Sequence, residues 1–101
     1  EGLIKFLLSL HPTAVALKKV FVFYILPMVN PDGVVNGYSK SDILGTGLNQ
    51  HWVEPSSALH PTLFHLKALM RRAQQGNGEI HAFFDLHGQA AKEGIFFHSV
   101  L

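Results

Sequence analysis

The chain has 101 residues, enough for one domain, and its composition is globular, with 48% hydrophobic and 15% charged residues. The formal net charge of +1 provides no basic field for nucleic acid and no polybasic patch for a membrane. Cysteine is absent, which excludes disulfides and thiolate metal sites and fits a reducing compartment. The longest apolar stretch, Val20 to Val29, contains Pro27 and is too short to span a bilayer.

The N-terminal part of the chain is predicted to form two helices. Apolar side chains from Leu3 to Leu10 recur at the i, i+3, i+4, i+7 spacing of an amphipathic helix, which His11-Pro12 ends. Thr13 to Lys18 is predicted to be a second, short helix with Thr13 as its N-terminal cap.

Three later segments have the composition of strands buried on both faces: Val20 to Val29, Ile80 to Leu86 and Ile95 to Val100. Asn30 to Ser57 is a long, polar, glycine-rich stretch, and a stretch of this kind is often functional. A helix over Leu63 to Ala73 follows it. This order predicts an α/β fold, in which part of a mixed, mostly parallel β-sheet is flanked by helices and the core is incomplete.

The histidines outside the strand ends are predicted to be structural. His60 precedes Pro61, which suits the first turn of a helix, so His60 is expected at the start of that helix. His65 is expected on the face of the same helix. No His-x-x-x-His pattern of a zinc site occurs in the chain.

Two short motifs directly follow predicted strands, where open α/β sheets build their sites. Asn30-Pro31-Asp32-Gly33 is by itself a turn signal, because Pro presets a dihedral angle, Asn and Asp bond to nearby backbone, and Gly tolerates a positive φ. In Asp85-Leu86-His87-Gly88, strand geometry puts Asp85 and His87 on one face. His87 is there a candidate zinc ligand with a carboxylate nearby, and the alternative is a buried polar pair bonded to the backbone.

Several sequence motifs of this chain, in the same order as in the family, resemble those of the cytosolic carboxypeptidases, which are zinc carboxypeptidases. Pro27 to Gly37 is similar to the family's Pro-Met-hydrophobic-Asn-Pro-Asp-Gly-Val pattern with its following glycine. Gly45 to Trp52 is similar to Gly-x-Asp-Leu-Asn-Arg-x-aromatic, and Pro55 to Thr62 to the Pro-Ser and Leu-His-Pro-Thr that come next. Asp85 to Gln89 is similar to Asp-x-His-Gly-His. The resemblance covers nearly the whole chain, residues 1–101, as a central fragment of a catalytic domain.

The resemblance implies a role for four residues of this chain. His87 takes the position of the third zinc ligand, and Asn49 that of the asparagine that contacts the substrate's terminal carboxylate. Gln50 stands where the family has the arginine that clamps this carboxylate, and Lys40 where an earlier arginine stabilises the oxyanion. The family's His-x-x-Glu motif is expected before residue 1 and its catalytic Glu beyond residue 101. Gln is neutral and Lys lacks the guanidinium fork, so both departures weaken the match to an active site.

Three functions remain open from the sequence. The first is a segment of a cytoplasmic zinc-dependent metallocarboxypeptidase that removes C-terminal residues, glutamates in particular, from protein tails such as glutamylated tubulin. In that reading Zn²⁺ binds the full domain, and this fragment alone is expected to bind it only weakly. The second is a catalytically degenerate relative that binds protein C-terminal tails without cleaving them, and the third is a plain α/β structural module. Neither nucleic acid nor membrane is expected as a partner.

Overall fold

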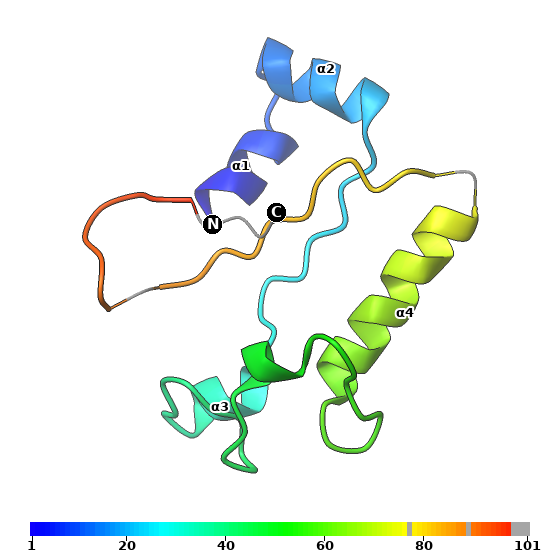
Figure 1. Cartoon of the computed structure of the whole chain (residues 1–101). Helices are drawn as coiled ribbons and strands as arrows, with labels where there is room; N and C mark the ends of the chain where they lie inside the picture. The colour runs from blue at the N-terminus through cyan, green and yellow to red at the C-terminus, as the bar shows by residue number, and fades with distance from the viewer. Residues whose placement is uncertain (77, 89, 98–101) are drawn as a thin grey trace.

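The computed structural model describes residues 1–76, 78–88 and 90–97. Helices and long extended connections make up this part of the chain (Figure 1). The elements in chain order are α1 (Gly2–Leu8), α2 (Pro12–Val20), α3 (Pro31–Val35), the 3₁₀-helix η1 (Leu48–His51) and α4 (Pro61–Gln75). No helix among the described residues is long and apolar enough to cross a bilayer.

The two N-terminal helices form where the sequence predicts them, but the cap of the second one differs. Helix α1 ends at Ser9, whose N–H and Oγ–H both donate to the Phe6 carbonyl, at 3.0 and 2.7 Å. Helix α2 begins at Pro12 and not at Thr13, because proline presets the dihedral angle of a first helical turn. The cap is His11, whose Nδ1 accepts the Thr13 N–H at 3.3 Å, so the prediction of Thr13 as the cap is wrong.

Helix α4 confirms the third predicted helix and extends it at both ends. Pro61 lies in its first turn and His60 is its N-cap residue, as expected from the His60-Pro61 pair. His65 lies on its exposed side. Arg72 is in the last turn, where a cation suits the helix dipole, and the chain leaves the helix at Gly76.

The predicted β-sheet is wrong for the part of the chain that the structure describes, because residues 1–76, 78–88 and 90–97 contain no strand. Segments 21–29 and 78–88 run as extended connections, and no backbone hydrogen bond joins them. Of the third predicted strand, 95–97 makes no backbone hydrogen bond to another described residue, and 98–100 lies outside the described residues. Their β-branched and aromatic composition favours extended backbone, but a strand also needs a neighbour in register to bond with. The α/β fold class is therefore corrected to a helical arrangement with extended connections.

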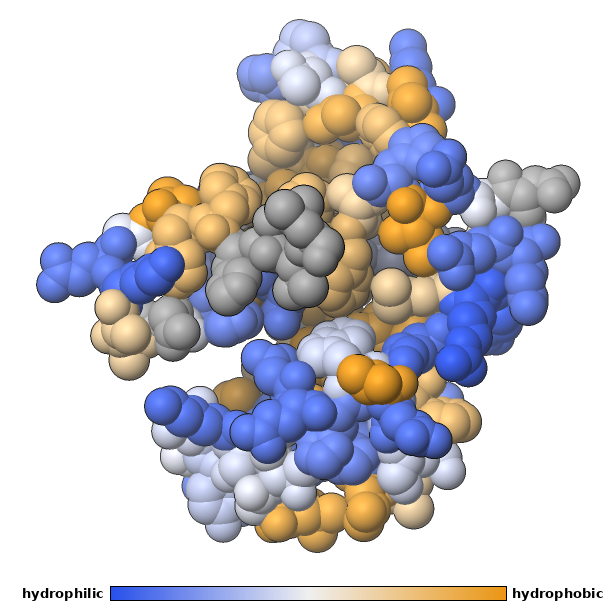
Figure 2. Space-filling view, viewed as in Figure 1, coloured by the Kyte–Doolittle hydropathy of each residue, from blue (hydrophilic) through white to orange (hydrophobic). Residues whose placement is uncertain are grey.

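The packed interior of the described chain is small. Its buried apolar residues are Leu7 and Ala14, at the contact between α1 and α2, and Leu63 on α4. Large apolar side chains instead reach the surface, as the orange areas in Figure 2 show. The radius of gyration of 15.8 Å exceeds the roughly 13 Å of a compact domain of this length. The fold thus holds its polar loops by local hydrogen bonds more than by a shared core.

Candidate functional site

Asn30 organises the start of the polar stretch that contains the predicted site residues. Its Oδ1 accepts the Gly33 N–H at 3.1 Å and so caps helix α3. Its Nδ2 donates to the Ser41 carbonyl at 2.9 Å, eleven residues further along the chain. Asn30-Pro31-Asp32-Gly33 is therefore the capped first turn of a helix, where the sequence alone indicated an isolated turn.

Gly33 is needed for space and not for an unusual dihedral angle. It is buried within α3, and its φ does not lie in the positive range that favours glycine. A Cβ atom built on Gly33 would stand 2.6 Å from the Ser41 carbonyl oxygen and would also collide with the Asn30 side chain. The tolerance of glycine for a positive φ is therefore not used at this position. The close approach of α3 to Ser41 is what requires glycine.

Asp42 holds the next turn together. This carboxylate is 8% exposed, and its Oδ1 accepts the N–H groups of Leu44 at 2.9 Å and Thr46 at 2.8 Å. The Asp42 N–H donates to the Thr46 carbonyl at 2.9 Å, which closes the turn, and Gly45 within it has a φ of +78°. Sequence reasoning did not single out Asp42. The signal was available, since an Asp followed three residues later by Gly is typical of a side-chain-bonded turn.

The turn brings two of the predicted site residues together at Gly47. A Cβ atom at Gly47 would lie 3.7 Å from the Lys40 carbonyl oxygen and 3.6 Å from Cδ of the Gln50 side chain. Gln50 and Asn49 both lie in η1, and the side chains of Lys40, Asn49 and Gln50 are all exposed. The Asn49 Oδ1 accepts the Trp52 indole N–H at 3.4 Å. Lys40, Asn49 and Gln50 therefore belong to one solvent-facing loop, which we call the 40–52 loop.

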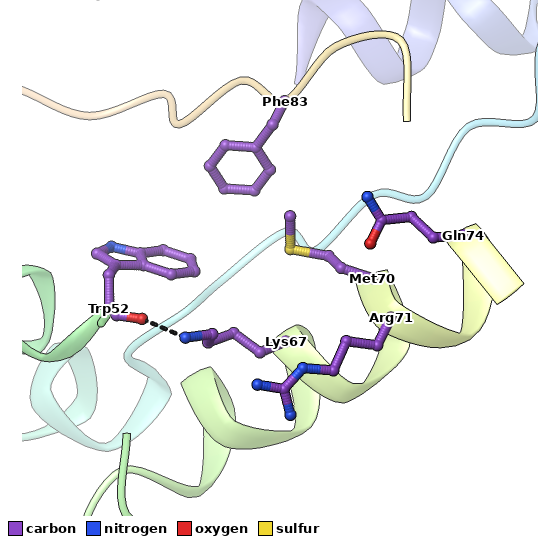
Figure 3. Close-up of a pocket in the computed structure, with 6 residues that line it drawn as sticks. All are labelled: Trp52, Lys67, Met70, Arg71, Gln74 and Phe83. Atoms are coloured by element: carbon purple, nitrogen blue, oxygen red, sulfur yellow. Dashed lines mark hydrogen bonds between the residues drawn. The ribbon is translucent and has the colours of Figure 1, made fainter. Parts of the chain in front are cut away.

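Lys67 of α4 anchors the end of the 40–52 loop. Its Nζ donates to the Trp52 carbonyl at 2.7 Å (Figure 3) and to the Val53 carbonyl at 2.7 Å. The cation thus satisfies carbonyls at the end of η1 that the helix leaves unpaired. Trp52 then meets Phe83 edge to face, with ring centroids 5.6 Å apart. Met70, Arg71 and Gln74 of α4 line the same groove. This groove joins the 40–52 loop to segment 78–88, and neither Trp52 nor Lys67 was predicted from the sequence to do so.

A histidine pair holds the rest of the loop against the start of α4. The rings of His51 and His60 are stacked, with centroids 4.1 Å apart and planes 15° apart. His60 is 6% exposed, and its Nδ1 accepts the Ser56 N–H at 3.1 Å. The structural role predicted for His60 is thus confirmed.

His87, the predicted zinc ligand, is exposed in segment 78–88. Its Nδ1 lies 2.8 Å from the Gly88 carbonyl, and its partner is this carbonyl and not the Asp85 carboxylate. In the tautomer that protonates Nδ1, this bond leaves the Nε2 lone pair for a metal. His87 follows the Trp52–Phe83 contact by four residues, which is roughly 13 Å of extended chain. The exposed ring excludes the alternative of a buried polar pair.

The residues that the structure describes do not complete a zinc site. A catalytic zinc takes three protein ligands and a water. Within 1–76, 78–88 and 90–97, no three His, Cys, Asp or Glu side chains are grouped to hold a metal ion. His87 fits one ligand position by its exposure and its Nδ1 bond.

Comparison with known proteins places this loop and segment in a family. No family model matches the chain. It is 37% identical over 98 residues to cytosolic carboxypeptidase 1 of Danio rerio, which covers 97% of the chain and 8% of that protein. It is 39% identical over 99 residues to cytosolic carboxypeptidase 4 of Mus musculus, covering 97% of the chain and 9% of that protein. With cytosolic carboxypeptidase 6 of Homo sapiens the identity is 36% over 99 residues, covering 97% of the chain and 20% of that protein.

The chain is therefore homologous over nearly its whole length to a segment of carboxypeptidases. More narrowly, it is homologous to a part of the cytosolic carboxypeptidases, which confirms the resemblance carried by its motifs. It spans only between 8% and 20% of the length of these three relatives.

Proposed function

We propose that the chain is part of a zinc-dependent metallocarboxypeptidase that removes C-terminal residues from protein tails. The observation that carries this proposal is the sequence identity of 37% and 39% to two carboxypeptidases, which extends over 97% of the chain. The 40–52 loop supports it, because one exposed loop presents an amide pair and a lysine to solvent. Cytoplasmic location is part of the proposal and rests on the relatives' name.

The 40–52 loop would bind the substrate's terminal carboxylate. The Asn49 and Gln50 amides each carry N–H donors, and both side chains are exposed on η1. Lys40 would add a positive charge from the same loop and would polarise the scissile carbonyl in place of the family's arginine. Asp42 and Lys67 would act as positioning residues, since one holds the turn before Gly47 and the other holds the end of η1.

His87 would supply one zinc ligand, and the remaining ligands and the general base would come from outside this chain. Bound zinc would activate water and polarise the scissile carbonyl. The Gly88 carbonyl would orient the His87 ring, as a hydrogen-bonded second partner commonly does for a ligating histidine.

Positive charge on α4 supports acidic tails as substrates. Within the described residues the one side-chain ion pair joins His81 and Glu79 at 3.7 Å, so Arg71 and Arg72 make none there. Both arginines are exposed near the end of α4, and Arg71 also lines the Trp52–Phe83 groove. Tails ending in glutamate, glutamylated tubulin among them, carry the complementary charge.

A tail-binding relative without activity is the second candidate, and two residues favour it. Gln50 and Lys40 replace the two arginines of the family pattern, and neither offers a charged fork with two parallel donors. A carboxylate bound by Gln50 would accept from an uncharged amide, and it would lack both the positive charge and the second parallel donor of a guanidinium. Such a site would retain specificity for a free C-terminus while losing much of its catalytic power.

Gln50→Arg in the intact protein tests the carboxylate role. Affinity for peptides with a free C-terminus should rise about tenfold, whereas affinity for the same peptides with an amidated end should stay unchanged. Gln75→Arg is the matched control, because it adds the same charge at an exposed glutamine at the end of α4. A gain in both binding and cleavage supports the enzyme, and a gain in binding alone supports the tail-binding relative. An equal effect of the two variants, or none, would show that Gln50 does not face the carboxylate.

A further inference from the structure

His60 lies where the 40–52 loop meets helix α4. It is the N-cap residue of α4 and is 6% exposed. Its ring is stacked on the ring of His51, with centroids 4.1 Å apart. His51 is the last residue of η1 and directly follows Asn49 and Gln50, the two amides proposed to bind the substrate's terminal carboxylate. The His60 ring is therefore part of the support on which η1 rests.

The hydrogen bonds of His60 require a neutral ring. Its Nδ1 accepts the Ser56 N–H at 3.1 Å, and its own backbone N–H donates to the Ser56 carbonyl at 2.8 Å. A ring nitrogen accepts a hydrogen bond only when it carries no proton. In the imidazolium form both ring nitrogens are donors, so a proton on Nδ1 would face the proton of the Ser56 N–H. Protonation of His60 therefore breaks its bond to Ser56.

Two further features oppose a positive charge on the His60 ring. As the N-cap residue, His60 stands at the positive end of the dipole of α4, where a cation is unfavourable. If His51 is protonated as well, two like charges lie in rings whose centroids are 4.1 Å apart. Acidification therefore weakens both the Ser56 bond and the stacked pair that supports η1.

The charged groups around the pair do not compensate this charge. The other titratable side chains of the 40–52 loop, the connection after it and the first two turns of α4 are Lys40, Asp42, Glu54, His65 and Lys67. Asp42 is bonded to backbone N–H groups of its own turn, Lys67 to carbonyls at the end of η1, and the other three are exposed. Within the described residues the one side-chain ion pair lies in segment 78–88, so no described carboxylate is paired with either ring.

We propose that His60 is a positioning residue for the carboxylate site and that it acts only in its neutral form. The neutral ring bonds Ser56 and supports His51, so that η1 presents its two amides. An imidazole takes up a proton as the pH falls from about 8 to about 5, and over this range η1 is released from the start of α4. Affinity for a free C-terminus therefore falls on acidification. This inference rests on the proposed function, because it takes η1 as the carboxylate site.

Amide hydrogen exchange of the intact protein at about pH 7.5 and about pH 5.5 tests the histidine contact without any substrate. The protection factor, from which the intrinsic effect of pH on exchange is removed, should fall about tenfold at the Ser56 amide. The amides inside α4 should keep their protection, because their partners do not titrate. Circular dichroism checks that each variant described below keeps its helices.

Three variants identify the group that responds to pH. His60→Asn should remove the pH effect at Ser56, because an amide oxygen accepts a hydrogen bond and does not titrate. His51→Phe keeps a stacked ring without a charge and should retain most of the effect. His11→Asn is the matched control, since His11 is also an N-cap residue whose Nδ1 accepts a backbone N–H, at 3.3 Å in α2. It should leave the effect at Ser56 unchanged.

Peptide affinity links the histidine contact to the carboxylate site. The wild type should bind a peptide with a free C-terminus about tenfold more weakly at the lower pH, although the peptide's carboxylate stays ionised there. His60→Asn should bind more weakly than the wild type at the higher pH, because the stacked ring is lost, and should change less with pH. The difference between the two proteins is the readout, because other histidines titrate in the same range.

Protection at Ser56 that does not change with pH overturns the proposal, and so does a pH effect that persists in His60→Asn or disappears in His11→Asn. These results leave the proposed function standing, because Gln50→Arg tests it separately. The expected exchange with an equal pH dependence of affinity in the wild type and His60→Asn overturns the positioning role. That result would also place the carboxylate site outside η1.

Discussion

Asp42→Ala should release the turn that supports the candidate site. The carboxylate accepts two backbone N–H groups, at 2.9 Å from Leu44 and 2.8 Å from Thr46, and it is 8% exposed. Alanine leaves both donors without this acceptor, although the Asp42 N–H can still reach the Thr46 carbonyl. The expected result is a local opening of residues 42–46 while α4 remains folded.

The magnitude follows from the two bonds. A hydrogen bond to a charged group contributes about 1.5–3 kcal/mol. The two bonds share one oxygen and do not add in full, so a loss of about 3 kcal/mol is expected for the turn. That loss of free energy corresponds to a roughly 100-fold larger equilibrium constant for local opening of the turn. The increase in exchange rate cannot exceed the protection that the turn has in the wild type.

Amide hydrogen exchange read residue by residue is the assay. The Leu44 and Thr46 amides should exchange faster in Asp42→Ala, and amides inside α4 should keep their wild-type rates. Asp42→Asn is the matched control, because its Oδ1 still accepts but is neutral, and it should give an intermediate effect. Unchanged exchange at Leu44 and Thr46, or an equal rise throughout α4, would refute a local role for Asp42.

Two further predictions concern the loop and the metal. Gly33→Ala should destabilise the start of α3 by about 1–3 kcal/mol, seen as faster exchange at the Gly33 position and neighbouring amides, because its Cβ would stand 2.6 Å from the Ser41 oxygen. Gly2→Ala, where nothing lies within 4 Å, should instead be harmless or slightly stabilising. Equal effects of the two substitutions would contradict the close-approach argument. Calorimetry of the 101-residue chain with zinc should show only weak binding, because no three ligand side chains are grouped among the described residues. Submicromolar binding lost in His87→Ala would mean that further ligands lie beside it.

Local structure was readable from the sequence wherever it depends on near neighbours. The helices around Leu7 and Leu63 follow from apolar spacing, and Pro61 marks the start of α4. The family was recognised from several motifs in the right order, because a motif specifies which residue types stand at which spacing. Composition alone does not contain this information. Asn49 and Gln50 were identified as site candidates for the same reason, and η1 does present them together.

The tertiary structure decided what depends on residues distant in the chain. Segments 21–29 and 78–88 have strand composition, but pairing needs two backbones in register, and composition cannot say whether they meet. Residue 33 must be glycine because the Ser41 carbonyl lies too close for a Cβ atom. The end of η1 is held by Lys67, which lies 14 or 15 residues after the carbonyls that it binds. Such contacts leave no periodic signal, because each depends on one donor or one gap that only the folded chain brings into place.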